Sequence, residues 1–193
     1  MTRDRIVAIF LILVGAVGVF AAAELTIERV LLAADANATL NCNFSLILQC
    51  GKNLASWQGA LFGFPNAIIG TVGFMAPIVV GASILAGARF ARWYWIVFNL
   101  GMAGAFTLVA WLIHESIFDL GTLCPWCMLV WSVTIPGFLV TTFRNASAGV
   151  FGRHLVRIGG ILLSWVVPIT IAVYLTVAII AQLRLDVLSH LLT

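Results

Sequence analysis

The sequence predicts an all-α integral membrane protein with five transmembrane helices, and its composition and apolar runs support this fold class. Of the 193 residues, 63% are hydrophobic and only 9% are charged, and the mean hydropathy is +1.14, far above that of water-soluble proteins. A helix needs about 20 mostly apolar residues to cross a bilayer. Five such runs cover approximately residues 6–23, 66–88, 93–113, 124–143 and 158–181. We therefore expect residues 1–193 to form a single domain in the lipid bilayer, and a net charge of +3 indicates no nucleic-acid partner.

The first run and the basic residues around the runs predict the orientation of the chain. With the N-terminus inside, seven arginines fall on the cytoplasmic side: Arg3, Arg5, Arg89, Arg92, Arg144, Arg153 and Arg157. Three basic residues then fall outside: Arg29, Lys52 and Arg184. This excess fits the positive-inside rule, and the Ala/Gly-rich spans suggest a bacterial cytoplasmic (inner) membrane. An alternative is that residues 1–23 are a cleaved signal peptide, because arginines precede a run that ends in three alanines.

Residues 24–65 form the candidate functional loop on the external side. Here charged and amide residues mix with apolar ones, and the segment contains Cys42 and Cys50. A short helix at the membrane surface is predicted after Cys50, because apolar residues recur at spacings of three to four: Leu54, Trp57 and Leu61. The opposite face would be polar, with Lys52, Asn53 and Gln58. An ordinary interfacial anchor helix produces the same pattern, so the cysteine is the feature that points to function.

A second cysteine pair, in Cys124-Pro125-Trp126-Cys127, begins the fourth apolar run. Proline fits the first position of a helix, so the two sulfurs would lie one turn apart on one helix face. The positive end of the helix dipole would stabilise the Cys124 thiolate, and Cys127 would lie one turn deeper, facing a lipid-soluble electron acceptor. All four cysteines fall on one side of the membrane, the oxidising side, where disulfides persist. The motif therefore indicates reversible oxidation.

Other uses of these cysteines are weaker interpretations. A c-type haem site would need a histidine after Cys127, where the sequence has Met128, and a zinc site would need reduced thiols on an oxidising side. Two structural disulfides in a non-enzymatic membrane protein remain an alternative. A disulfide within the CxxC motif would close so short a loop that it would stabilise little, which favours a redox role.

Three polar residues precede the second pair: His114, Glu115 and Asp119. A solvated loop is the favoured interpretation of these residues, and a proton relay is the alternative.

These motifs, taken together, resemble the vitamin K epoxide reductase family and its bacterial disulfide-forming homologues. The matching pattern is Cys42-x7-Cys50, then Ser56, then Gly63-Phe64-Pro65-Asn66, then Cys124-Pro125-Trp126-Cys127. The resemblance implies a bundle of four helices around a quinone, with Cys124 and Cys127 as the active-site pair. It implies further that Cys42 and Cys50 are a shuttle pair and that Cys50 exchanges with Cys124.

The resemblance also implies contacts with the quinone, whether menaquinone, ubiquinone or a vitamin K form. Asn66 would donate to a quinone carbonyl and Ser56 would lie nearby, although helix capping and packing are alternatives for both. Trp131 stands where vertebrate members have a tyrosine, so the ring contact is kept and the hydroxyl is lost. Many bacterial members carry a fused thioredoxin-like domain after the fifth span, and this chain ends at Thr193. A separate thioredoxin-fold, DsbA-like oxidase is therefore the expected partner.

The order of the cysteine pairs separates this family from the other four-helix quinone-linked thiol oxidases. In those proteins the CxxC lies in the first external loop, whereas here the wider pair comes first. We expect a quinone-dependent thiol–disulfide oxidoreductase that supports disulfide formation in exported proteins. The alternative enzyme is a vitamin K quinone or epoxide reductase of a secretory membrane.

Overall fold

The computed structural model describes residues 3–35 and 38–187, and in this part of the chain five helices are long and apolar enough to cross a membrane. The candidate spans are Asp4–Ala34, Asn66–Leu85, Arg92–Leu120, Pro125–Ser147 and Val166–Leu185. The predicted fold class, a helical protein with five transmembrane segments, is thereby confirmed.

The first helix is longer than the sequence predicted. Helix α1 (Arg3–Ala34) continues through residues 24–34, which we assigned to the external loop. Its last turns still contribute to the core, because Leu25 is buried among the residues that surround three of the cysteines. The charged residues there do not end the helix, so the loop proper begins after it. At its other end Leu11 is fully buried, so residues 6–23 belong to the bundle as well.

The remaining spans differ from their predicted extents in detail. The second is broken at Phe74 into α3 (Asn66–Gly73) and α4 (Met75–Leu85), and the third is α5 (Arg92–Glu115) followed by a π-helical turn, Ser116–Leu120. The fourth is α6 (Pro125–Ser147). The fifth begins with α7 (Val156–Ser164), and after Trp165 it continues as α8 (Val166–Leu185).

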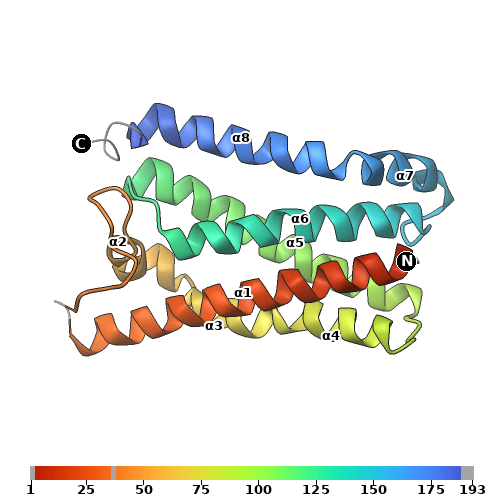
Figure 1. The fold of residues 1–193 in the computed structure, drawn as a ribbon, viewed down its shortest axis with the longest axis horizontal. Helices are drawn as coiled ribbons and strands as arrows, with labels where there is room; N and C mark the ends of the chain where they lie inside the picture. Colours follow the sequence, from red (N-terminus) through yellow and green to blue (C-terminus); the bar gives the residue numbers. More distant parts are fainter. Residues whose placement is uncertain (1–2, 36–37, 188–193) are drawn as a thin grey trace.

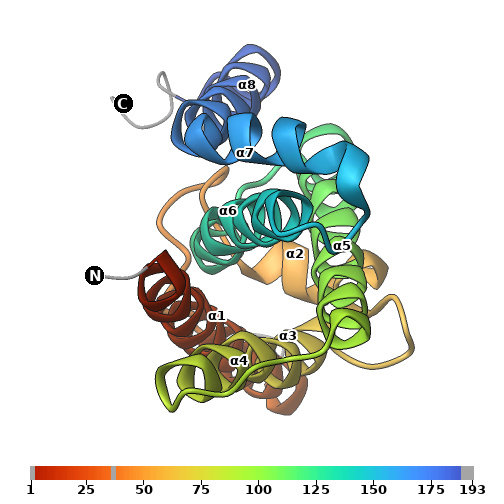
Figure 2. The same ribbon diagram turned by 90° about the vertical axis from the view of Figure 1, so that its right-hand side faces the viewer.

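Helix α6 lies at the centre of the molecule (Figure 2). It contacts α1 on one side, α5 on another, and α7 and α8 on a third, while α3 and α4 pack along α1. Helix α8 lies at the outside (Figure 1) and is the least buried of the spans. Four spans therefore form the bundle and the fifth covers part of its surface.

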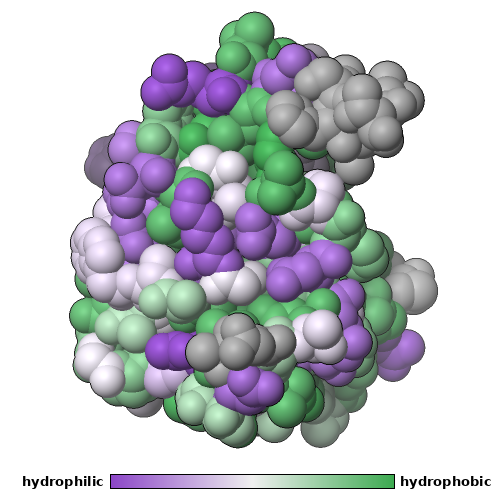
Figure 3. All heavy atoms as spheres, turned by 90° about the vertical axis from the view of Figure 1, so that its left-hand side faces the viewer, coloured by the Kyte–Doolittle hydropathy of each residue, from purple (hydrophilic) through white to green (hydrophobic). Residues whose placement is uncertain are grey.

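The two ends of the bundle differ in chemistry. The connection that carries α2 (Gly51–Ala55) lies at one end, and the N-terminus and the basic turns between α4 and α5 and between α6 and α7 lie at the other (Figure 1). Hydrophilic side chains gather on the end that carries α2, bordered by hydrophobic ones (Figure 3). The basic turns and the cysteine loop are therefore on opposite ends, as the charge pattern predicted.

Helices α1 and α4 pack so closely that a glycine is required between them. A Cβ atom on Gly81 would lie 2.5 Å from the backbone oxygen of Ala8 and 3.2 Å from the backbone nitrogen of Ile12. Small residues allow this kind of approach between membrane helices.

We predict that Gly81→Ala destabilises the protein by about 1–3 kcal/mol, because the helix backbones must move apart. The matched control is Gly160→Ala in α7, where an added Cβ meets nothing within 4 Å. Thermal unfolding in detergent measures both variants. Equal midpoints for Gly81→Ala and Gly160→Ala would contradict the close packing.

Candidate functional site: a cysteine relay beside an apolar cavity

Three of the four cysteine sulfurs meet in one buried cluster. Cys42 and Cys50 form a disulfide, and Cys124 and Cys127 are free thiols. The Sγ atom of Cys124 lies 3.0 Å from the Sγ atom of Cys50, and Cys42, Cys50 and Cys124 are buried. This separation is within contact distance for thiol–disulfide exchange. No group of three or more metal-binding side chains occurs among the described residues.

A short stretch of backbone pairing brings Cys50 to Cys124. The N–H of Leu123 donates to the carbonyl of Ile47 at 2.8 Å, and the N–H of Gln49 donates to the carbonyl of Leu123 at 3.0 Å. Gln49 directly precedes Cys50, and Leu123 directly precedes Cys124. The backbone pairing therefore holds these two cysteines side by side.

The turn between Cys42 and Cys50 is closed by the side chain of Asn43. Its Oδ1 accepts hydrogen bonds from the N–H groups of Cys50 at 2.9 Å and Gly51 at 3.2 Å. An asparagine that satisfies nearby N–H groups in this way stabilises a tight loop. The loop conformation that presents Cys50 is therefore encoded within the loop.

Polar contacts also tie α2 to the turn that precedes Cys124. Asn53 Nδ2 donates to Thr122 Oγ1 at 3.1 Å, and Ser116 Oγ donates to Asn53 Oδ1 at 3.3 Å. The ammonium of Lys52 donates to the carbonyl of Leu120. These contacts fix the connection that we predicted as an interfacial helix onto the bundle.

Sequence reasoning missed a buried carboxylate on α1. Glu28 is 1% exposed, and its Oε1 accepts a hydrogen bond from the N–H of Asn41 at 3.1 Å, next to Cys42. The spacing of Leu25, Glu28 and Leu32 places the acid on the α1 face that packs against the cysteines. That spacing is the signal that could have identified it. Glu28 anchors the start of the cysteine loop at Asn41.

The environment of Cys124 favours its thiolate form. Cys124 is the N-cap of α6, and its Sγ accepts a hydrogen bond from the N–H of Cys127 at 3.4 Å. The hydrogen bond from the Cys127 side chain lowers the pKa of the Cys124 thiol most, and the backbone N–H groups of Cys127 and Trp126 add to this shift. Burial opposes the shift without reversing it. The sequence-based expectation of a thiolate at the helix start follows from the same N–H groups.

An apolar cavity of about 800 Å³ lies next to the cysteine cluster. It extends between α3, α4, α5 and α6, and of the four cysteines only Cys127 lines it. Its volume is within the usual range for small-molecule sites, and a mostly apolar wall with a few polar groups is typical of them. Gly101 and Gly104 widen it, because an added Cβ at either would meet nothing within 4 Å. A small lipid-soluble molecule fits this space.

The three predicted quinone contacts all line the cavity, but the polar side-chain atoms of Ser56 and Asn66 are engaged in the loop. Ser56 Oγ donates to the carbonyl of Asn53 at 2.7 Å and accepts from the N–H of Gly59 at 3.3 Å, which is a capping role. Asn66 Nδ2 donates to the carbonyl of Gln58 at 2.6 Å, and its Oδ1 accepts from the N–H of Leu61 at 3.1 Å. The Asn66 amide has a second N–H, which can donate to a ligand.

Trp131, the third of these residues, is 7% exposed and packs in an apolar cluster with Val109 and Ile135. It lies one turn beyond Cys127 on α6, as the sequence predicted, and its ring forms part of the cavity wall.

The predicted faces of the short surface helix are wrong. Helix α2 ends at Ala55, and the chain restarts as a 3₁₀ turn at Trp57–Ala60, so the spacing does not keep one face. As a result Leu54 is buried while Trp57 is 64% exposed. Gln58, predicted on the polar face, is 2% exposed, because its amide binds acidic side chains on α5 and the π-helical turn.

The fold and this geometry define a multi-pass membrane protein with two coupled cysteine pairs beside a cavity for an apolar ligand. The model of the vitamin K epoxide reductase family matches residues 9–142, which run from within α1 to within α6 and include all four cysteines. The chain therefore belongs to the vitamin K epoxide reductase family, whose members are membrane oxidoreductases that use quinones or vitamin K as electron partners. No curated protein and no solved structure matches the chain.

The contact between the two cysteine pairs can be trapped. In Cys42→Ala/Cys127→Ala, the remaining Cys50 and Cys124 are predicted to form a disulfide on mild oxidation, because their sulfurs already lie 3.0 Å apart. In the matched Cys50→Ala/Cys124→Ala variant, Cys42 and Cys127 should remain reduced. Mass spectrometry of peptides from non-reduced protein measures both. A bond between Cys42 and Cys127 at equal yield would contradict the geometry.

The alkylation rate of Cys124 in the wild-type protein provides a test of its thiolate, because Cys127, whose side chain lowers the pKa most, is still present. Thiolate is the attacking form, so the rate of Cys124 alkylation rises with pH and levels off above the pKa of Cys124. Because that pKa is lowered, the plateau should be reached at a lower pH than for a free thiol of about 8.5. Quenched-flow alkylation measures the rate, and a plateau at or above the free-thiol pH would contradict the prediction.

Proposed function

We propose that this protein oxidises the thiols of a thioredoxin-fold partner and transfers the electrons to a membrane quinone, which supports disulfide formation in exported proteins. The single observation that supports this most strongly is the 3.0 Å contact between Cys50 and Cys124. It joins a disulfide in the loop to a thiol pair whose second member lines the cavity.

The exchange steps follow from the cysteine order, starting from oxidised pairs. A thiolate of the reduced partner attacks Cys42, releases Cys50 and forms a mixed disulfide, which the partner's second thiol resolves. The Cys50 thiolate then attacks Cys124, breaking the Cys124–Cys127 disulfide. Attack of Cys42 on Cys50 re-forms the loop disulfide and releases the Cys124 thiolate.

The end point of these steps is the state that the structure holds: a Cys42–Cys50 disulfide and a reduced Cys124–Cys127 pair. Cys42 is 1% exposed in this state, so the loop must move before a partner can attack it. Formation of the Cys124–Cys127 disulfide removes the thiolate from its place against Cys50, which allows this movement.

The cavity supports a quinone as the electron acceptor. Bound there, a quinone accepts two electrons and two protons. Cys127 and Trp131 would face the ring, the second N–H of Asn66 would donate to a carbonyl, and the apolar walls would exclude water. These are roles for residues that the structure places around one space.

The location that we propose is the bacterial cytoplasmic membrane, with the N-terminus inside and the cysteines on the external face. The basic turns lie at the end opposite the cysteine loop, which agrees with the positive-inside rule. The external compartment is oxidising, so the disulfides persist there.

Replacement of each pair distinguishes its role in quinone reduction. The purified protein is expected to reduce menadione with dithiothreitol as the donor, and Cys127→Ala should abolish this activity, because no disulfide can form beside the cavity. Cys50→Ala should keep most activity with dithiothreitol and lose it with a reduced DsbA-like oxidase. Absorbance of menadione measures the rates.

An equal loss with both donors in Cys50→Ala would contradict the shuttle role of the loop pair. A folded wild-type protein that reduces no quinone would contradict the proposed function and favour two structural disulfides. Thr176→Val is the control variant, because Thr176 lies on α8 and does not line the cavity. It should reduce menadione at the wild-type rate.

A further inference from the structure

The cavity wall contains one carboxylate. Of the residues that line the cavity, Glu115 is the only aspartate or glutamate. It lies at the end of α5, where the helix changes to the π-helical turn. Ionisable side chains inside membrane proteins are costly and are usually functional, and π-helical turns often mark functional sites.

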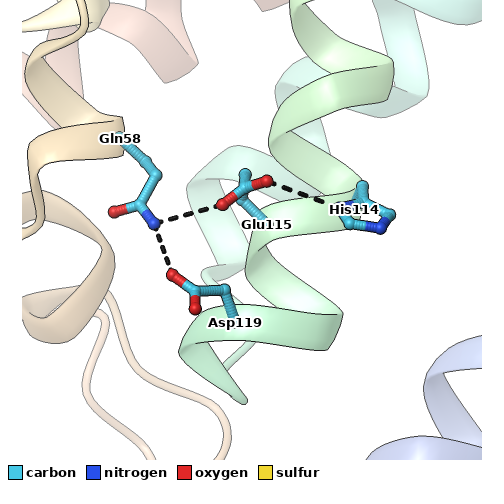
Figure 4. Close-up of polar contacts among 4 residues, drawn as sticks. All are labelled: Gln58, His114, Glu115 and Asp119. Atoms are coloured by element: carbon cyan, nitrogen blue, oxygen red, sulfur yellow. Dashed lines mark hydrogen bonds and ion pairs between the residues drawn. The ribbon is translucent and has the colours of Figure 1, made fainter.

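A short polar network links Glu115 to exposed side chains at the protein surface (Figure 4). Its Oε1 lies 3.4 Å from Nδ1 of His114, whose side chain is 64% exposed, whereas the side chain of Glu115 is 17% exposed. The amide of buried Gln58 donates to Glu115 Oε2 at 3.2 Å and to exposed Asp119 at 2.6 Å. The carboxyl group thus borders the cavity and touches a side chain in contact with water.

The amide of Gln58 fixes the positions of both acids. The oxygens that Gln58 contacts, Glu115 Oε2 and Asp119 Oδ2, act as acceptors, so the Nε2 side of the amide must face them. Gln58 is held on the 3₁₀ turn whose cap is Ser56, and it lines the cavity together with Glu115. Gln58 is therefore a positioning residue for Glu115.

The proton balance of the proposed reaction requires such a group. Cys124 is favoured as a thiolate, so oxidation of Cys124 and the Cys127 thiol to a disulfide releases two electrons and only one proton at the cavity. Reduction of a quinone to its quinol consumes two electrons and two protons. One proton per turnover must therefore come from another group or from water.

We propose that Glu115 donates this proton to the electron acceptor in the cavity and regains it from water through His114. In each turnover the O–H bond of the Glu115 carboxyl breaks, the carboxylate keeps the electron pair, and a proton from His114 restores the acid. This inference rests on the proposed function, because it assigns the second proton of that reaction.

Other charged groups lie close to the network and must be accounted for. Lys52 of α2 donates to the carbonyl of Leu120, and the guanidinium of Arg184 on α8 lies 4.9 Å from the ring centre of Phe118. His114 stacks on the same Phe118 ring at 4.8 Å. Neither cation forms an ion pair with Glu115, so His114 is the ionisable contact of Glu115 on the water side.

The test compares Glu115→Gln with wild type in the full chain, reconstituted in lipid nanodiscs. Oxidation of the reduced Cys124–Cys127 pair by menadione in a single turnover is expected to slow by about 10²-fold, the usual contribution of a proton donor. Menadione affinity, measured by tryptophan fluorescence quenching, provides a second readout. It should be the same in wild type and in Glu115→Gln, because an amide keeps a hydrogen bond to the acceptor and lacks only the transferable proton.

Two further variants complete the test. Glu24→Gln, a carboxylate on α1 that does not line the cavity, should behave as wild type. His114→Ala leaves the cavity wall unchanged, and it should keep the single-turnover rate and slow steady-state turnover, because only the return of the proton is affected.

A folded Glu115→Gln protein with the wild-type single-turnover rate would overturn the inference and leave the proposed function standing. If Glu115→Gln does not fold, unchanged steady-state turnover in His114→Ala would overturn it. Failure of wild type to reduce menadione would overturn both.

Discussion

The pairing of residues 47–49 with Leu123 is the constraint on which the rest of the site depends. Two backbone hydrogen bonds join segments more than 70 residues apart, and each segment leads directly into a cysteine. Backbone groups buried at a membrane surface must be paired. This contact pairs the backbone groups of the loop and also holds the sulfurs of Cys50 and Cys124 next to each other. Asn43 and Glu28 hold the loop in the shape that the pairing requires.

The cysteines lie in two different environments, and this difference gives the relay a direction. The loop disulfide and Cys124 belong to the buried cluster at the end of the bundle, and Cys127 lies between that cluster and the cavity. In the proposed reaction, thiol chemistry with a protein partner and electron transfer to an apolar acceptor are therefore separated by one turn of α6. Gln58 and Glu115, two members of the polar network with Asp119, line the same cavity as Cys127.

The sequence predicted the fold class and the spans because a helix that crosses a bilayer must have a long apolar run, and such a run is visible in the sequence without knowledge of tertiary contacts. It did not predict the length of α1, because Glu24 and Glu28 read as loop residues, and only the contact with Asn41 shows why a carboxylate is stable there. The burial of Gln58 was missed for a similar reason: its partners, Glu115 and Asp119, are more than 50 residues away in the chain. The cysteine pattern predicted two pairs at one membrane face, whereas the side-chain contacts of Ser56 and Asn66 depend on how the loop turns back on itself.

The central claim is that electrons from the loop pair reach a quinone through the second pair, and the most direct measurement counts them. The four cysteines, fully reduced, hold four electrons, and each quinone accepts two. Fully reduced protein, freed of reductant and mixed with excess menadione, should therefore convert two menadione molecules per chain, and Cys50→Ala should convert one. Conversion of one menadione per wild-type chain, with the loop thiols still reduced, would contradict the relay.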